Sequence, residues 1–210
     1  MIKEIILTPE ELYCIGRFLQ AKYIDYAYVA AMADFKQDYE LFEKEIMDGL
    51  IKTGFLMEDF SGNIEVDQQI VDLLNPIFFG ENETSLEICD ISSDKKVCVY
   101  KFHFFDGAIT MVTNQEGRLL IKAVDQVNIK NIVEDVLSSD YNVEAEVVTI
   151  HTERVVTRFI AAKSILVGKS SFVKTYIDSE GVLYQENTDT VQSVSKDMFV
   201  SDVYEIVKGM

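Results

Sequence analysis

The sequence predicts an α+β fold, because helical patterns fill its first third and strand patterns dominate the rest. Apolar residues recur at helical spacing up to about residue 80 and at alternate positions from about residue 86. Hydrophobic residues make up 48% of the 210 residues, which is ample for a buried core. We therefore expect a winged-helix-like helical part over 1–80, then two related antiparallel sheet-plus-helix units over 81–140 and 141–210, packed as one globular unit.

The first helix is expected over about residues 9–21. Thr8 can cap it, and Pro9 suits the first helical position because its missing N–H would be unsatisfied there anyway. Glu11 completes a capping box with Thr8. The apolar face that follows consists of Leu12, Ile15, Phe18 and Leu19.

Two further helices give the first third the order of a winged-helix motif. One is expected over about 38–53 and ends at Gly54, a position that suits a left-handed residue. The other is expected over about 66–75 and stops before Pro76. Between them lie an acidic turn built on Ser61-Gly62-Asn63 and a short strand.

The charge of the chain excludes nucleic acid and membrane insertion from the expected functions. The net charge is -17, and residues 1–90 hold 6 basic and 19 acidic residues. A DNA-reading helix needs Lys and Arg, whereas the helix over 38–53 carries mostly carboxylates. An acidic surface also disfavours anionic membranes, and no apolar run approaches the ~18 residues of a membrane span. The acidity is therefore read mainly as a source of solubility.

The two sheet-plus-helix units follow from period-2 patterns. In the first, Asp106-Gly107 predicts a type I′ hairpin turn, Asn114 to Gly117 a longer turn, and Asp125 the cap of a closing helix. In the second, a final helix is expected over about 196–208. The expected strands are 86–91, 97–105, 108–113 and 118–124, and then 143–150, 153–162, 171–177 and 182–187.

An internal repeat links these two units. The pattern Glu-Gly-x-Leu occurs at Glu116-Gly117 and again at Glu180-Gly181, an offset of 64 residues, and the two helices correspond at an offset near 70. The matched positions are turn and strand residues that any hairpin could use. Coincidence is therefore the alternative to a true repeat.

The sequence offers no catalytic, cofactor or metal motif, so none of these sites is expected. His103 and His151 each stand in a strand pattern without a second ligand at metal-binding spacing. Phosphate-binding and nucleophile motifs are missing from the sequence. Cys14, Cys89 and Cys98 lack CxxC spacing and are read as small core residues of a cytoplasmic protein.

One segment suggests a binding surface. Lys101-Phe102-His103-Phe104-Phe105 places large groups on both faces of a strand. Either the strand is buried on both faces, or one aromatic face is left for a protein partner. The candidate partner-binding residues are Phe102, His103, Phe105, Phe78 and Phe79.

The first third also resembles a known family. The segments Leu7–Tyr13, Leu50–Leu56 and Ile70–Leu74, with the acidic turn before Ile64, resemble the start of the EspG-like accessory proteins of type VII (ESX) secretion, and in particular their short EsaE-like relatives. The resemblance implies an EspG-like pseudo-repeat fold. It also implies a cytosolic, non-enzymatic chaperone or adaptor.

As a partner, the resemblance implies a secreted helical-hairpin protein of WXG100 or LXG type, kept soluble and delivered to the secretion machinery. The alternative is a winged-helix-derived regulatory or scaffold protein that binds another protein or a small molecule. A basic patch would favour that alternative, assembled from Lys95, Lys96, Lys101, Arg118 and Lys122. An enzyme would instead need a pocket of convergent polar groups.

Overall fold

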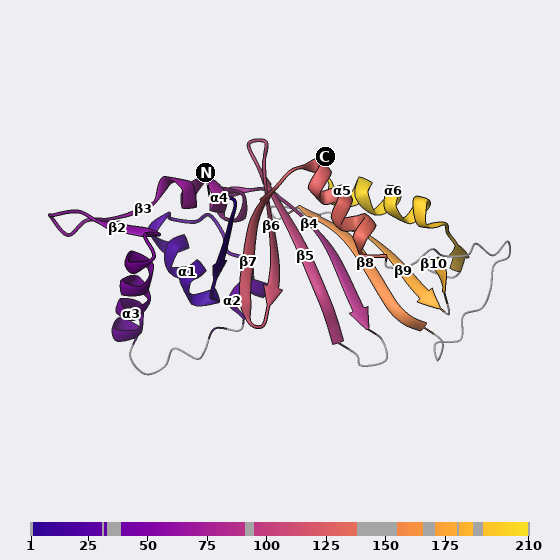
Figure 1. Ribbon diagram of the computed structural model, residues 1–210, viewed down its shortest axis with the longest axis horizontal. Helices are drawn as coiled ribbons and strands as arrows, with labels where there is room; N and C mark the ends of the chain where they lie inside the picture. The colour runs from indigo at the N-terminus through magenta and orange to yellow at the C-terminus, as the bar shows by residue number, and fades with distance from the viewer. Residues whose placement is uncertain are drawn as a thin grey trace. The chain divides into compact units, whose positions relative to one another are not determined.

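A computed structural model shows a mixed α/β fold with six helices and a large antiparallel sheet in the part of the chain that it describes (Figure 1). Two compact units make up the chain. Unit 1 contains Met1–Gly80 and Phe105–Ala123, and unit 2 contains Glu81–Phe104 and Val124–Met210. The described residues are 2–30, 32, 39–90, 95–137, 155–165, 171–179, 181–186 and 191–209.

Unit 1 surrounds one apolar core with helices and short strands. Strands β1 (Glu4–Leu7), β7 (Arg118–Val124) and β6 (Ala108–Gln115) are neighbours in that order, and Ile5 pairs with Ile121. Strands β2 (Leu56–Glu58) and β3 (Ile64–Val66) form a separate hairpin. The helices are α1 (Pro9–Phe18), α2 (Tyr26–Val29), α3 (Tyr39–Lys52) and α4 (Gln68–Phe79).

Helix α1 begins as predicted. Thr8 Oγ1 accepts from the Glu11 backbone N–H at 3.1 Å, and a Glu11 carboxylate oxygen accepts from the Thr8 N–H at 2.7 Å, which is the expected capping box. The helix ends at Phe18, three residues before the predicted limit, and Gln20 adopts a positive φ of 53°. Leu12 and Ile15 are completely buried in the unit 1 core.

The predicted stop before Pro76 is wrong, because α4 continues through this proline to Phe79. A proline inside a helix removes one hydrogen bond and costs roughly 3 kcal/mol. Continuing the helix buries Pro76, Ile77 and Phe78 in the core of unit 1. Each buried apolar side chain returns roughly 1.5–3 kcal/mol, so burial outweighs the lost hydrogen bond.

Unit 2 is an antiparallel sheet with two helices on one face. Its strand order is β5-β4-β8-β9-β10-β11. The Phe199 ring of α6 packs edge-on against Phe159 and Tyr176 of the sheet, with ring centroids 5.3 and 4.9 Å away. The elements are β4 (Asn82–Asp90), β5 (Lys95–Phe105), α5 (Gln126–Asp135), β8 (Val155–Ile165), β9 (Ser171–Ser179), β10 (Val182–Glu186), β11 (Val191–Ser193) and α6 (Lys196–Val207).

Most predicted elements of unit 2 lie within a few residues of the observed ones. Asp125 caps α5 as expected, and α6 ends one residue before the predicted limit. The predicted strand 143–150 lies outside the described residues. Strand β11 had no counterpart in the prediction, because its three residues are too few to show a period.

The hairpin turns confirm one prediction and correct another. Asp106 and Gly107 both have positive φ, 47° and 79°, as a type I′ turn requires. The turn predicted to span Asn114 to Gly117 is shorter than expected, because β6 extends to Gln115 and only Glu116 and Gly117 remain between the strands. Their φ angles of 52° and 84° again fit a two-residue turn.

The same turn chemistry recurs 64 residues later. The Asn114 side-chain oxygen accepts from the Gly117 N–H at 3.0 Å, and Asp178 accepts from the Gly181 N–H at 3.3 Å. Both glycines have φ above 80°. These shared contacts agree with the predicted repeat, which stays a prediction, as does the winged-helix assignment of α3, β2, β3 and α4.

Candidate functional site

The five predicted partner-binding residues are divided between the units and differ in exposure. Phe78, Phe102 and His103 are buried, Phe79 is half-buried, and Phe105 is 38% exposed. The rings of Phe79 and Phe105, both in unit 1, lie 6.3 Å apart. The structure therefore brings one pair of the set together and leaves Phe105 as its exposed member. As a binding site, the set stays a prediction.

The register of β5 explains the burial of its aromatic segment. Phe102 lies opposite Thr84 of β4, and the Thr84 hydroxyl donates to the Val207 carbonyl of α6 at 2.8 Å. Because directly opposed residues share a sheet face, Phe102 lies under the helices. His103 is opposite Glu83 and belongs to the other face, where it is also buried. At these two positions the strand is therefore buried on both sides.

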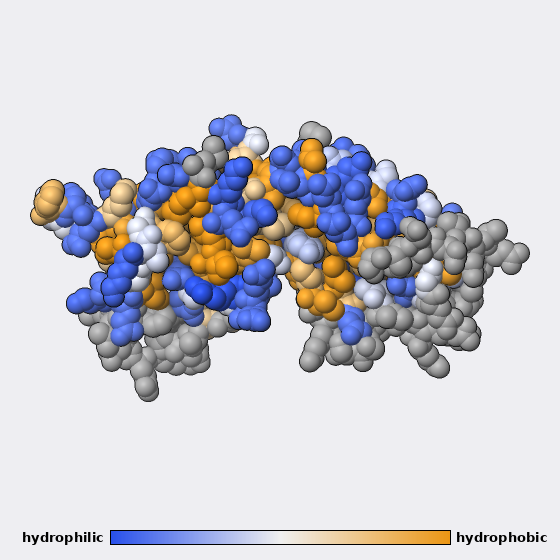
Figure 2. Space-filling view, viewed as in Figure 1, coloured by the Kyte–Doolittle hydropathy of each residue, from blue (hydrophilic) through white to orange (hydrophobic). Residues whose placement is uncertain are grey.

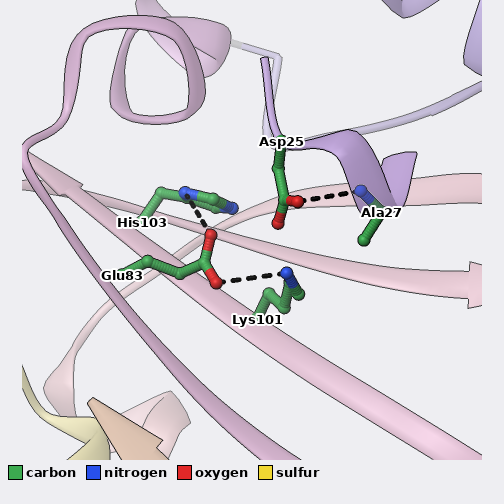
Figure 3. Close-up of polar contacts among 5 residues, drawn as sticks. All are labelled: Asp25, Ala27, Glu83, Lys101 and His103. Atoms are coloured by element: carbon green, nitrogen blue, oxygen red, sulfur yellow. Dashed lines mark hydrogen bonds and ion pairs between the residues drawn. The ribbon is translucent and has the colours of Figure 1, made fainter. Parts of the chain in front are cut away.

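A small charged cluster accompanies His103 (Figure 3). One Glu83 carboxylate oxygen accepts from the Lys101 ammonium at 3.1 Å, and the other lies 3.8 Å from His103 Nδ1. Burying a lone charge is costly, and the pairing of Glu83 with Lys101 reduces that cost. We read the cluster as a structural ion pair of unit 2. The same view shows Asp25 of unit 1, which caps α2 by accepting from the Ala27 N–H at 2.8 Å.

Three of the five basic residues that would favour the alternative function are paired with carboxylates. Lys101 pairs with Glu83, Lys122 Nζ lies 3.5 Å from Glu4, and Arg118 lies 3.9 Å from Glu11. Each pair cancels its own positive charge, so these three residues add little attraction for an anionic ligand. The side chains of Lys95 and Lys96 lie outside the described part of the structure.

The sheet of unit 2 presents apolar side chains, interspersed with polar ones such as Glu87 and Thr175, on the face opposite α5 and α6. Phe159 contacts α6, so its neighbour Ile160 points to the other face. Register places Ala162 and Val173 beside each other on that same face, and Val173 is 52% exposed. Val99 of β5 and Ile160 of β8 both pair with Glu87 of β4, so all three side chains lie on the same face of the sheet. We call Val99, Ile160, Ala162 and Val173 the open face.

A second surface feature of unit 2 is a groove of about 830 Å³ between α5 and α6. The Lys196 ammonium donates to the Leu137 carbonyl at 3.1 Å, which satisfies a carbonyl just beyond the end of α5. A mixed lining of this kind suits a polypeptide segment better than a single anionic ligand. The lining residues include Lys130, Glu134, Leu137, Lys196, Asp197, Val200 and Tyr204.

Two buried titratable groups, Cys14 of unit 1 and Tyr176 of unit 2, are held in their neutral forms. Burial, with Glu43 nearby, raises the pKa of Cys14 to about 11, so this thiol stays protonated at neutral pH. Burial and the neighbouring Asp202 carboxylate raise the pKa of Tyr176, whose hydroxyl donates to Asp202 at 3.1 Å. Both groups therefore act as packing or hydrogen-bonding residues.

Searches for two other kinds of site gave negative results within the described ranges. Those residues contain no group of three or more His, Cys, Asp or Glu side chains that could hold a metal ion. They also form no helix that is both long enough and apolar enough to cross a membrane. His151 lies outside the described residues.

Comparison with known proteins finds a relative by structure only. No protein-family model matches the sequence, and no curated protein matches it either. The solved structure of the Mycobacterium tuberculosis type VII secretion system chaperone EspG5, in complex with a PE25-PPE41 dimer, matches 99% of this chain and 96% of that chain with a TM-score of 0.66. The chain is similar in fold to EspG5.

The sequence identity to EspG5 is 8%, so the likeness concerns the fold. The EspG-like fold implied by the resemblance is confirmed at this level, whereas a place among the EsaE-like proteins stays a prediction. EspG5 is described as a type VII secretion system chaperone. The match extends over both units, because nearly the whole chain is covered.

Three exposed features of the structure were not predicted from the sequence. The open face depends on register between distant strands, and the α5–α6 groove depends on helix packing, so neither is visible in a local pattern. The third is Phe60, in the loop of the β2–β3 hairpin, which is fully exposed. Its signal was an aromatic residue inside an acidic turn, between Asp59 and Ser61.

Proposed function

We propose that this protein is a cytoplasmic, non-enzymatic chaperone or adaptor of type VII secretion. It would bind a secreted helical-hairpin protein of WXG100 or LXG type, keep it soluble and present it for export. The observation that carries this proposal is the whole-length similarity in fold to EspG5, whose solved structure contains a PE25-PPE41 dimer. The net charge of -17 would keep the loaded complex dispersed.

We assign the substrate to the open face of unit 2. A helical hairpin carries an apolar stripe that water disfavours, and the open face offers apolar side chains with polar neighbours between them. Exposed Val173 would contribute most, because it loses the largest solvent-accessible area on contact. Specific complexes bury roughly 1,200–2,000 Å², so other surfaces must contribute as well.

Two further surfaces are assigned supporting roles. The α5–α6 groove would hold a polar and apolar segment of the substrate. From the predicted aromatic set, Phe105 and its neighbour Phe79 would contact the partner in unit 1. Phe78, Phe102 and His103 would act through the stability of the surfaces they support, since all three are buried.

The experiment is co-expression with each WXG100- or LXG-type protein secreted by the same organism. We expect at least one of them to stay in the soluble fraction and to co-elute in size-exclusion chromatography only when this protein is present. Its affinity is then measured by isothermal titration calorimetry. If every such protein stays equally soluble and elutes alone, the chaperone proposal fails.

A matched pair of variants tests the assigned surface. Val173→Glu places a carboxylate on the open face, and we expect the substrate to bind about tenfold more weakly or worse. Val127→Glu changes an equally apolar side chain on α5 that is 65% exposed, and it should bind as the wild type does. Equal affinities for both variants would remove the open face from the proposal but leave the chaperone role in place.

A further inference from the structure

The loop of the β2–β3 hairpin presents an aromatic ring to solvent. Phe60 has a relative exposure of 113%, so its side chain is at least as accessible as in an extended chain. In Figure 1 this hairpin projects at the far left, and in Figure 2 its tip is an apolar spot among hydrophilic neighbours. Met57 of β2 is also exposed on this hairpin. The surface therefore contains two large apolar side chains within four residues.

Hydrogen bonds hold the loop in one conformation. The Asp59 carboxylate accepts from the backbone N–H of Ser61 at 2.7 Å, and from the backbone and side-chain N–H groups of Asn63 at 2.9 and 2.8 Å. The Asp59 N–H donates to the Asn63 carbonyl at 2.9 Å, and Gly62 takes a φ of 83° that suits glycine. Phe60 is thus displayed by an ordered turn.

The charges around Phe60 are all of one sign in the sequence. No Lys, Arg or His occurs from Thr53 to Asp94. The hairpin itself carries exposed carboxylates at Glu58, Asp59 and Glu65. These groups repel phosphates and anionic lipid headgroups, which argues against nucleic acid and membrane as the surface that receives the ring. They attract a surface rich in Lys and Arg.

The combination matches the anatomy of a protein-binding anchor. Interface centres are enriched in aromatic residues, and polar or charged residues surround them. An anchor that is already ordered loses less conformational entropy on binding. An isolated exposed apolar residue is ordinary on a protein surface. Here the ring stands at the tip of a hydrogen-bonded turn, with a second apolar side chain and three carboxylates beside it.

We infer that the β2–β3 hairpin is a docking element that inserts Phe60 into an apolar pocket rimmed by Lys and Arg side chains on a partner protein. This partner differs from the helical substrate assigned to the open face. The ring fills the pocket, and Glu58 and Glu65 pair with the basic rim. The inference depends on the hairpin alone and holds whichever substrate unit 2 carries.

The test is site-specific photo-crosslinking with the full-length protein in its own cells. The probe is p-benzoylphenylalanine, which keeps an aromatic side chain, placed at position 60 and, as a control, at the exposed Val127 of α5. We expect one product that is specific to position 60. Mass spectrometry should locate the crosslink in an apolar segment flanked by Lys or Arg. A Glu58→Lys, Glu65→Lys double variant should lower its yield about tenfold.

With the crosslinked protein purified, Phe60→Ala should weaken its binding about 30-fold or more, whereas co-elution with the helical substrate is unchanged. Equal products from both probe positions would overturn the inference. So would a crosslink to lipid, to nucleic acid or to a second copy of this chain. A product whose yield is unchanged in the charge-reversal variant would also overturn it. Loss of substrate binding in Phe60→Ala would also overturn it, because the hairpin would then belong to the substrate site.

Discussion

Two aromatic segments of this protein differ in the burial of their rings. In β5, Phe102 is completely buried on the helix-covered face of the sheet, and its neighbour His103 is buried on the other face. In the β2–β3 hairpin, Phe60 is fully exposed at the tip of an ordered turn. The first segment contains three phenylalanines within four residues, and the second contains one. Phe105 of the first segment is 38% exposed, so burial of a ring depends on its position in the sheet and not on aromatic density along the chain.

The two segments differ because they have different numbers of neighbouring groups that can bury an aromatic ring. A strand of a larger sheet with helices packed on it has neighbouring side chains that can bury its rings. A two-stranded hairpin has too few neighbours to bury a ring at its tip. Burial of Phe102 contributes to folding, whereas exposure of Phe60 leaves its binding energy for another molecule. Substitutions in the two segments should separate these two uses.

The largest expected effect is that of Phe102→Ala. Removing this buried ring leaves a cavity in the core of unit 2, and we expect the free energy of unfolding to fall by about 3–5 kcal/mol. Phe60→Ala removes an identical group from solvent and should change it by less than about 0.5 kcal/mol. Urea unfolding followed by circular dichroism measures both. Equal losses in the two variants would contradict the assignment of core and surface.

Local signals were enough to predict where most elements begin and turn. The α1 capping box depends on Thr8 and Glu11, with Pro9 between them, so the start of this helix is readable from a few neighbouring residues. The Asp106-Gly107 turn is equally local, since it follows from the φ preferences of two residues. Interactions of this range are contained in the sequence pattern itself.

Features set by distant contacts were not predicted. The continuation of α4 through Pro76 depends on a core that Ile77 and Phe78 share with residues far along the chain. The open face depends on β4 pairing with β8, whose residues are more than sixty positions away. Exposure of Phe60 also escaped prediction, because a single ring in a turn gives no periodic signal.

The next largest effect is expected at Gly209, which lies against the β5 segment. This glycine has a φ of 78°, and a Cβ there would overlap the Phe104 ring. Gly209→Ala combines left-handed backbone strain of about 1–2 kcal/mol with an overpacking cost of about 1–3 kcal/mol. The free energy of unfolding should therefore fall by roughly the sum of these two costs. Thermal and urea unfolding both report this loss.

Gly62→Ala in the hairpin is the matched control. Its φ of 83° is almost the same, but the nearest atom to an added Cβ is a Glu58 side-chain oxygen at 3.9 Å. Only the backbone term of about 1–2 kcal/mol should appear. If Gly209→Ala costs no more than Gly62→Ala, the Phe104 ring moves aside, and the β5 segment is less tightly packed than the structure indicates.

A smaller and purely local effect is expected from Asp59→Ala. The variant loses the carboxylate that accepts from Ser61 and Asn63, so the tip should become mobile while the urea midpoint stays where it is. Backbone ¹⁵N relaxation should show order parameters for residues 60–63 falling from about 0.85 to below about 0.6. Glu65→Ala removes a carboxylate of the same hairpin that lies outside the turn, and it should leave these values unchanged.

The smallest expected effect is the pH response of the hairpin tip. Hydrogen bonds from the Asn63 side chain and backbone, and then from neighbouring N–H groups, hold the pKa of Asp59 below its ordinary value. A lowered pKa in the folded state means that the hydrogen-bonded turn is fully stabilised above the ordinary value of about 3.9 and loses this stabilisation as the pH falls through the lower, folded value. At neutral pH the display of Phe60 is therefore intact.

NMR titration of the Asp59 carboxyl carbon should give a midpoint below that of an unfolded peptide. Asn63→Ala should raise this midpoint, since the hydrogen bond from the Asn63 side chain is the largest cause of the lowered pKa. A midpoint at the ordinary value in the wild-type protein would mean that the turn does not hold Asp59, and Phe60 would then be displayed by a loose loop instead of an ordered one.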